Sequence, residues 1–187
     1  MATDTHADPI NEEKLNELVE TSLVDLGATV HAALAVIGDE LGLYAALDDA
    51  GPLTSVELAD KTDIAERYVR EWLRSQAAGG YVTYDPETDR YYLTPEQAHI
   101  LANEESPVFM PGAFQLVGSV AKIGPQLKEA FQTGEGIGWH EHDDDVFHGT
   151  ERFFGPSYGA FLLDWIAALN GIDSRLKTGG KIVDVGC

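Results

Sequence analysis

Between residues 12 and 41, apolar side chains recur every three or four positions, which is the spacing of one face of an α-helix. Val30, Leu34, Ile37 and Leu41 form the clearest stripe. Other apolar side chains lie off this stripe, whereas a surface helix normally has a single apolar face. The pattern therefore predicts a long helix that packs on the core of its own chain with one face and contacts a second partner with the other. The simplest such partner is a second copy of the chain in a homodimer.

Residues 55–94, which follow a short helical piece over 43–47, have the order of elements of a winged helix-turn-helix unit, in which two helices precede a β-hairpin. Ser55 is the expected N-cap of the first helix and Thr62 or Asp63 that of the second, which ends at the pair Gly79-Gly80. The hairpin loop, residues 85–89, is rich in turn formers. The expected elements are helices over 43–47, from Ser55 to Asp60 and from Thr62 or Asp63 to Gly79, and strands over 81–84 and 90–94.

The next part of the chain predicts helices separated by loops. One helix should begin at Pro95, and residues 106–133 and 153–169 are apolar at helical spacing. Residues 134–149 contain four glycines and three histidines and are expected to form a loop. Either apolar segment could cover the second face of the first helix within one chain, which is the monomeric alternative to the dimer.

The final seven residues, Lys181 to Cys187, are an apolar strand that runs into a glycine turn. Glycine is needed where a backbone approaches a ligand closely, and ligands of parallel sheets lie at the carboxyl ends of the strands. The segment Val183-Asp184-Val185-Gly186-Cys187 resembles motif I of class I S-adenosylmethionine-dependent methyltransferases. Many buried strands end in Asp and Gly, so this motif alone does not identify the family. The elements that precede it in the chain carry the rest of the resemblance. A winged helix and linking helices before it resemble the methyltransferases with an N-terminal winged-helix domain, of which small-molecule O-methyltransferases are the best known.

The resemblance implies a fold class and a role. The fold would be mainly α, a winged helix-turn-helix domain plus linking helices, ending at the first strand of a Rossmann-like α/β methyltransferase domain. The chain would serve dimerisation and substrate covering in a methyltransferase for a small-molecule acceptor, and alone it should be inactive because most of the cofactor sheet is missing. The expected divisions are a disordered lead-in over 1–11, a helical dimerisation and winged-helix domain over 12–98, a helical linker or substrate lid over 99–176, and the truncated cofactor-binding domain over 177–187.

Five residues are candidates for binding the cofactor or the acceptor. By the resemblance, Asp184, Gly186 and Cys187 would line the methionine end of S-adenosylmethionine. Phe154 and Tyr158 could form the wall of an acceptor pocket, because small-molecule sites are commonly lined by aromatic side chains. Aromatic residues at helical spacing belong to a core more often than to a binding site, so both interpretations stay open here.

His140, His142 and His148 are candidate general bases if the acceptor is a hydroxyl group, because imidazole accepts a proton near neutral pH. They belong to the predicted loop, which in this layout could close over the cofactor domain. The simpler interpretation is that they are solvated loop residues. With the acids at 143–145 they also form a set of possible metal ligands. Three consecutive carboxylates cannot all face one ion, and no cysteine supports a closed zinc site, so no metal is expected.

Acidic residues outnumber basic ones by 32 to 12, which gives a net charge of −20. Such a charge repels phosphate backbones and anionic membranes, so neither nucleic acid nor a membrane is an expected partner. Salt would screen the repulsion between these like charges. The acidic composition is therefore consistent with adaptation to high salt and equally with an ordinary acidic cytosolic protein. The single cysteine, Cys187, excludes an intramolecular disulfide. We expect a cytoplasmic protein, because neither a signal peptide nor a run of about 18 apolar residues is found.

A winged-helix transcriptional regulator with a C-terminal ligand-sensing domain is the alternative function. Arg67, Arg70 and Arg74 form a basic stripe on the second helix of the unit, which in regulators enters the major groove of DNA. Glu66 and Glu71 lie within reach of these arginines, and the hairpin tip carries acids where a DNA-binding wing needs lysines. The stripe is therefore expected to form surface ion pairs. A dimerisation module without further activity is the third possibility.

Overall fold

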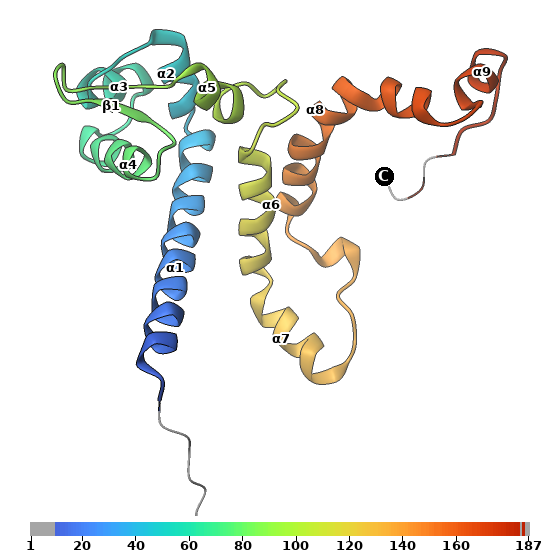
Figure 1. Ribbon diagram of the computed structural model, residues 1–187, viewed down its shortest axis with the longest axis horizontal. Coiled ribbons are helices and arrows are strands. Elements are labelled where there is room, and N and C mark those ends of the chain that lie inside the picture. Colours follow the sequence, from blue (N-terminus) through green and yellow to red (C-terminus); the bar gives the residue numbers. More distant parts are fainter. Residues whose placement is uncertain (1–9, 184, 186–187) are drawn as a thin grey trace, which may run out of the picture.

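The computed structural model describes residues 10–183 and 185, and its regular structure is mainly helical with two short strands (Figure 1). The elements are α1 (Glu12–Glu40), α2 (Leu43–Ala50), α3 (Ser55–Thr62), α4 (Glu66–Ala78), β1 (Thr83–Asp85), β2 (Arg90–Tyr92), α5 (Pro95–Leu101), α6 (Pro111–Lys122), α7 (Gly124–Thr133), the 3-10 helix η1 (Trp139–Glu141), α8 (Asp144–Ala168) and α9 (Ile172–Lys177). The mainly helical fold and the winged helix-turn-helix order are as the sequence predicts.

The winged-helix unit has a single apolar core between α2, α3, α4, the hairpin and α5. Its buried side chains are Leu43, Tyr44, Leu47, Leu58, Val69, Trp72, Leu73, Val82, Tyr91 and Leu101. The hydroxyl of Tyr44 donates to Oε1 of Gln76 at 2.6 Å inside this core, so the buried amide is partly satisfied. The indole Nε1 of Trp72 donates to the carbonyl of Leu34 at 2.8 Å, which fastens α1 to the unit.

The two strands form the wing as a short antiparallel pair with Tyr84 opposite Tyr91. Tyr91 also exchanges backbone hydrogen bonds with Leu53, which forms an isolated antiparallel bridge on the other side of β2. The side chain of Arg90 binds the carboxylate of Glu57 at 2.7 Å and so ties the wing to α3. Strand β2 is thus held both to the segment before α3 and to α3 itself.

Two helix starts differ from the sequence prediction. The N-cap of α3 is Thr54, not Ser55, and its hydroxyl accepts from the backbone N–H of Glu57 in a capping box. The N-cap of α4 is Ala65, because Asp63 adopts a left-handed conformation (φ 55°) that ends α3 instead of starting α4. For α3 the predicted cap was of the right residue type but one position late, whereas for α4 the predicted capping residues do not cap the helix.

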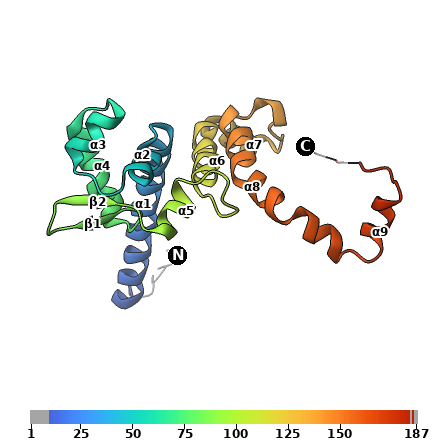
Figure 2. The same cartoon turned by 90° about the horizontal axis from the view of Figure 1, so that it is seen from above.

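Helices α6 and α8 pack side by side as an antiparallel pair beside α1 (Figures 1 and 2). A Cβ atom added at Gly149 would lie 2.6 Å from the backbone nitrogen of Leu116, so glycine is required where α8 approaches α6. The guanidinium of Arg152 on α8 binds Asp39 on α1 at 2.7 Å and Glu104 at 2.8 Å. These contacts join the pair to the winged-helix unit.

The segment expected to be a loop, residues 134–149, is partly helical, which corrects the prediction. It contains η1, and α8 already begins at Asp144 because Asp143 caps it by accepting from the N–H of Asp145. The expected C-terminal strand does not form in residues 181–183 and 185, where no neighbouring strand is present to pair with it. A short helix that the sequence did not predict, α9, precedes this segment.

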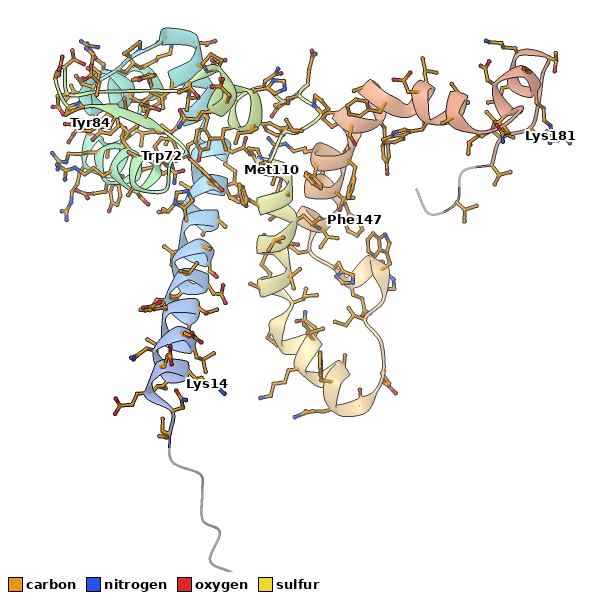
Figure 3. All side chains as sticks on the ribbon, in the orientation of Figure 1. Lys14, Trp72, Tyr84, Met110, Phe147 and Lys181 are labelled. Carbon is orange, nitrogen blue, oxygen red and sulfur yellow. The ribbon has the colours of Figure 1, made fainter. Side chains whose placement is uncertain are left out.

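Two helical segments project away from the packed part of the chain. All residues of α1 from Glu12 to Val30 are exposed, and α8 leaves α6 beyond Pro156 and carries α9 at its far end (Figures 1 and 2). In Figure 3, Lys14 lies at the free end of α1, far from the crowded side chains around Trp72. The region is therefore a compact winged-helix unit with two unsupported helical extensions.

Helix α1 corrects the expectation that no segment could span a membrane. By length and composition alone it could cross one, and only 11% of its most apolar window is buried. This is weak evidence, because core helices of soluble proteins satisfy the same condition.

Candidate functional site

The three residues proposed to bind the cofactor lie outside the described part of the chain. Asp184, Gly186 and Cys187 follow Val183, the last residue of the continuous described stretch. Their interpretation therefore stays a prediction that rests on the sequence motif. The described part of the chain that precedes them consists of α8, α9 and residues 178–183, on the extension that leaves the winged-helix unit (Figure 1).

The three candidate bases lie along one stretch that joins η1 to α8. His140 belongs to η1 and is exposed, and His142 follows it with its ring 5.5 Å from that of Trp139. His148 is an exposed residue in the second turn of α8 and not a loop residue as expected. Trp139 also contacts Phe147 edge-on at 5.1 Å, so an aromatic cluster and not a set of converging imidazoles organises this segment.

The acids beside these histidines have structural partners. Nζ of Lys122 on α6 lies 2.9 Å from the carboxylate of Asp143 and also contacts Asp145, which further accepts from the amide of Gln115 at 2.7 Å. The Lys122 ammonium, with the Gln115 amide, lowers the pKa of Asp145. Among the described residues, no group of three or more potential ligands has the geometry of a metal site. The acid run fastens α8 to α6 and caps α8.

Phe154 and Tyr158 lie on α8 on either side of Pro156 and stack on each other, with ring centres 6.3 Å apart and planes inclined by 20°. Their exposed fractions are 41% and 52%, so within the described chain they are not core residues. Trp165 continues the row, 5.9 Å from Tyr158. The row is an exposed aromatic face on the helix that leads to the cofactor segment, and its contact with an acceptor stays a prediction.

The basic stripe of α4 is neutralised by neighbouring acids. Arg70 lies 3.4 Å from Glu66 and 3.8 Å from Glu71, and Arg74 lies 3.3 Å from Glu71. These are exposed ion pairs of the kind that contribute little to stability, but they offset the charge that a phosphate backbone would need. The surface ion pairs expected for this stripe are therefore confirmed for Arg70 and Arg74.

A groove between α1, α4 and α6 was not identified from the sequence as a site. It has a volume of about 820 Å³. Its lining consists of Leu23, Val24, Leu26, Gly27, Ala28, Val30, His31, Ala32, Ser75, Ala78, Gly79, Tyr81 and Phe114. None of these side chains is an acid, although the whole chain carries a net charge of −20.

His31 is the one histidine among the residues that line this groove. Its ring contacts Tyr81 edge-on at 4.4 Å and packs directly on Gly79. Its Nε2 is buried and has no hydrogen-bond partner among the described residues, and burial lowers the pKa of His31 below its ordinary value of 6.5. The sequence held one signal for this site, a histidine in its most apolar stretch, Ala28 to Ile37.

Residues 29–103 match the family model described as the Rv2258c-like winged HTH domain. This range contains the end of α1, the winged-helix unit and α5, so the winged helix-turn-helix assignment is confirmed. No protein among those with curated functions matches the chain in sequence.

Solved structures share the fold over most of this chain. The mitomycin 7-O-methyltransferase MmcR is 22% identical with a TM-score of 0.66, over 86% of this chain and 50% of that one. An O-methyltransferase family protein from Burkholderia thailandensis is 17% identical with a TM-score of 0.57, over 83% and 46%. PigF, solved with SAH, is 14% identical with a TM-score of 0.52, over 87% and 49%. The chain thus spans about half the length of these proteins, and the likeness is one of fold.

Proposed function

We propose that this chain is the N-terminal region of an S-adenosylmethionine-dependent methyltransferase that acts on a small-molecule acceptor. One observation carries the proposal. A winged-helix unit, a pair of packed helices and a projecting helix follow one another in the order found in O-methyltransferase structures, and the motif Val183-Asp184-Val185-Gly186-Cys187 comes where a cofactor domain would begin. Fold likeness and motif are independent of each other, and both support the same class.

The chemistry would come from the sulfonium methyl of S-adenosylmethionine, which the acceptor displaces in line. Asp184, Gly186 and Cys187 would hold the methionine end of the cofactor by the resemblance to motif I. The winged-helix part would orient the acceptor. It would cover the acceptor and hold it aligned with the methyl group, which lowers the entropic part of the activation barrier. Phe154 and Tyr158 are the aromatic residues proposed to contact the acceptor, and His140, His142 and His148 the candidates for its base.

The proposal is tested by the sequence that follows codon 187 of the gene. A methyltransferase requires that the turn after Cys187 continue as Gly-x-Gly, with an acidic residue about 20 positions later for the ribose hydroxyls. A continuation without these glycines, or with a ligand-sensing domain of another fold, would contradict the proposal and favour a regulator.

The regulator is the second candidate, and the paired arginines of α4 argue against it. We predict that mobility-shift assays at about 0.15 M salt show no complex with mixed duplexes at micromolar protein, because the net charge opposes the phosphate contacts that supply non-specific affinity. A shifted band that disappears in Arg70→Glu, but persists in the matched variant Arg175→Glu on α9, would support the regulator.

We also propose that the protein is a cytoplasmic homodimer that associates through α1. The proposal is supported by the exposed apolar side chains along this helix, including Leu18, Leu23 and Val24 at 64%, 61% and 70% exposure. Leu34, assigned from the sequence to the same stripe, packs instead against the core of its own chain. A variant that tests the interface must therefore change the exposed half of α1 and not Leu34.

A further inference from the structure

The outer part of α8, residues 154–168, contains no buried residue, because both buried residues of this helix precede it. It carries Phe154 and Tyr158, and the helix continues without interruption past Pro156 to its end (Figures 1 and 2). The direction of the outer part is therefore set by the contacts that hold the last packed turn of α8.

Arg152 lies in this last packed turn, directly before the outer part. A Cβ atom added at Gly112 of α6 would lie 2.9 Å from Cβ of Arg152 and 2.8 Å from the backbone nitrogen of Phe153. Glycine permits the two helices to approach this closely, because it has no side chain. The backbone of α8 is therefore fixed against α6 at Arg152.

The side chain of Arg152 extends this contact to other parts of the chain. Its guanidinium donates to both carboxylate oxygens of Asp39 on α1, at 2.7 and 3.0 Å. It also donates to Oε1 of Glu104 at 2.8 Å and to Oε1 of Gln115 on α6 at 3.2 Å, and it lies 5.2 Å from the ring centre of Phe109. Two parallel hydrogen bonds from a planar guanidinium fix an orientation as well as a distance.

Asp39 is the most shielded partner of Arg152. Its side chain is 11% exposed, the lowest value among the ion pairs of the described residues, whereas that of Glu104 is 70% exposed. A shielded charge that loses its partner stays poorly solvated, so the paired geometry is strongly preferred, while an exposed pair contributes little. The contact with Asp39 therefore determines how α8 is oriented relative to α1.

We propose that Arg152 is a positioning residue for the acceptor. It sets the direction in which the outer part of α8 leaves the winged-helix unit, and so it places Phe154 and Tyr158, the proposed acceptor contacts. This inference rests on the proposed function and adds the residue that orients its acceptor site.

Lys122 provides a matched comparison within the same pair of helices. It also binds two carboxylates, those of Asp143 and Asp145, and so ties the beginning of α8 to α6. Neither of these contacts involves α1. Loss of Lys122 should therefore leave the direction of the outer part unchanged, whereas loss of Arg152 should not.

The first test measures distances by pulsed electron paramagnetic resonance in the 187-residue chain on a Cys187→Ser background. Spin labels replace Lys61, an exposed residue of α3, and Leu163, which is 80% exposed on the outer part of α8. Dilution with unlabelled chain restricts the measured distances to one copy. Leu163 lies about 17 Å along the helix from Arg152, so a change of about 20° in direction moves the label by about 6 Å.

Arg152→Met should shift or widen the distance distribution by about that amount, about 6 Å, and Lys122→Met should leave it as in the wild type. Asp39→Asn should reproduce the effect of Arg152→Met. Arg152→Lys keeps the charge without the planar fork and should give an intermediate width. Labels at Lys61 and Glu87, both within the winged-helix unit, should give the same distance in every variant and so show that this unit stays folded.

Two results would overturn the inference. A distribution for Arg152→Met that matches the wild type would mean that the glycine contact with α6, together with Pro156, sets the direction without the arginine. Equal widening in Arg152→Met and Lys122→Met would mean that any tether of α8 has the same effect.

The second test separates this inference from the proposed function. In the protein encoded by the gene read beyond codon 187, Arg152→Met should leave the calorimetric affinity for S-adenosylhomocysteine unchanged, because the proposed cofactor residues follow Val183. Weaker binding would mean that Arg152 acts on the cofactor site, and would overturn its assignment to the acceptor. If the longer protein without substitutions binds no S-adenosylhomocysteine, the methyltransferase proposal fails together with the acceptor role, while the distance measurements still decide what orients α8.

Discussion

His31 lies at the contact between α1 and the winged-helix unit, and its charge state affects the stability of that contact. It lies on α1 where the free half of the helix ends, and its ring fills the space beside Gly79 and Tyr81 of the winged-helix unit. Its Nε2 has no hydrogen-bond partner among the described residues, and no carboxylate lowers the cost of charging the ring there. Protonation of the imidazole therefore destabilises this contact between α1 and the winged-helix unit.

We predict that low pH weakens this contact and lowers the free energy of unfolding. The pKa of His31 is lowered in the folded state, so the folded chain binds fewer protons than the unfolded one, and stability is complete above the ordinary pKa of 6.5 and falls below it. Urea unfolding from about pH 7.5 to about pH 5.5 should show a decreasing free energy of unfolding. His31→Phe keeps an aromatic ring without the charge and should reduce this decrease. An equal pH dependence in both proteins would contradict the role of His31.

The residue scale also shows what the sequence could not provide. The polarity of His31 within an apolar stretch was visible, but its contacts with Gly79 and Tyr81 depend on how α4 returns to α1. Thr54 and Ser55 are both good caps, and only the path of the chain after Leu53, which pairs with β2, decides that Thr54 takes the position. Propensity names the residue type, and tertiary contacts choose the residue.

Among the elements, α8 has two halves with different roles. Its first half packs on α6 through Gly149 and through the contact of Arg152 with the amide oxygen of Gln115, and the same arginine binds Asp39 on α1 and Glu104. Its second half, beyond Pro156, projects with the aromatic row towards α9. Proline inside a helix removes one backbone hydrogen bond and bends the helix, so Pro156 marks the division.

We predict that Arg152 is the main polar link between α8 and α1. Its side chain is 28% exposed and that of Asp39 only 11%, so the loss of the pair leaves a poorly solvated carboxylate. Arg152→Met should lower the free energy of unfolding by roughly 1.5–3 kcal/mol in urea titrations. Arg175→Met, on exposed α9, is the matched control and should change it by less than about 0.5 kcal/mol. Equal effects would contradict the link.

At the element scale, periodicity predicted most helices but not all boundaries. The long helix α1, the break near Gly124 and the start of α5 at Pro95 follow directly from spacing, proline and glycine. The early start of α8 depends on Asp143, whose capping role is concealed in a run of three acids. The C-terminal strand needs neighbouring strands, so local pattern alone could not form it.

Over the whole molecule, acidic surface is the dominant property. The 32 acids are offset by 12 bases, and several of these bases are already paired, as in Arg90 with Glu57 and Lys177 with Asp173. Self-repulsion of this size opposes both compactness and association with a second copy. Added salt screens it, and the apolar contacts of the core and of α1 are not weakened by screening.

We therefore predict that salt stabilises the protein. The melting temperature should rise by several degrees from about 0.1 M to about 1 M sodium chloride, and dimerisation should strengthen over the same range. The double variant Glu17→Gln/Glu20→Gln removes two exposed acids of α1 and should show a smaller salt dependence of dimerisation. A melting temperature that falls with salt would mean that attractive ion pairs outweigh the repulsion between like charges, which would contradict this prediction.

The most direct test of the central proposal, that this chain is the front of a methyltransferase, is a calorimetric titration with S-adenosylhomocysteine. Residues 1–187 contain only the sequence of the first expected strand and of its glycine turn from the cofactor site, and they should show no micromolar binding. The protein encoded by the gene read beyond codon 187 should bind one equivalent per chain, and Asp184→Asn should weaken that binding. Tight binding to residues 1–187 alone, or none to the longer protein, would contradict the account.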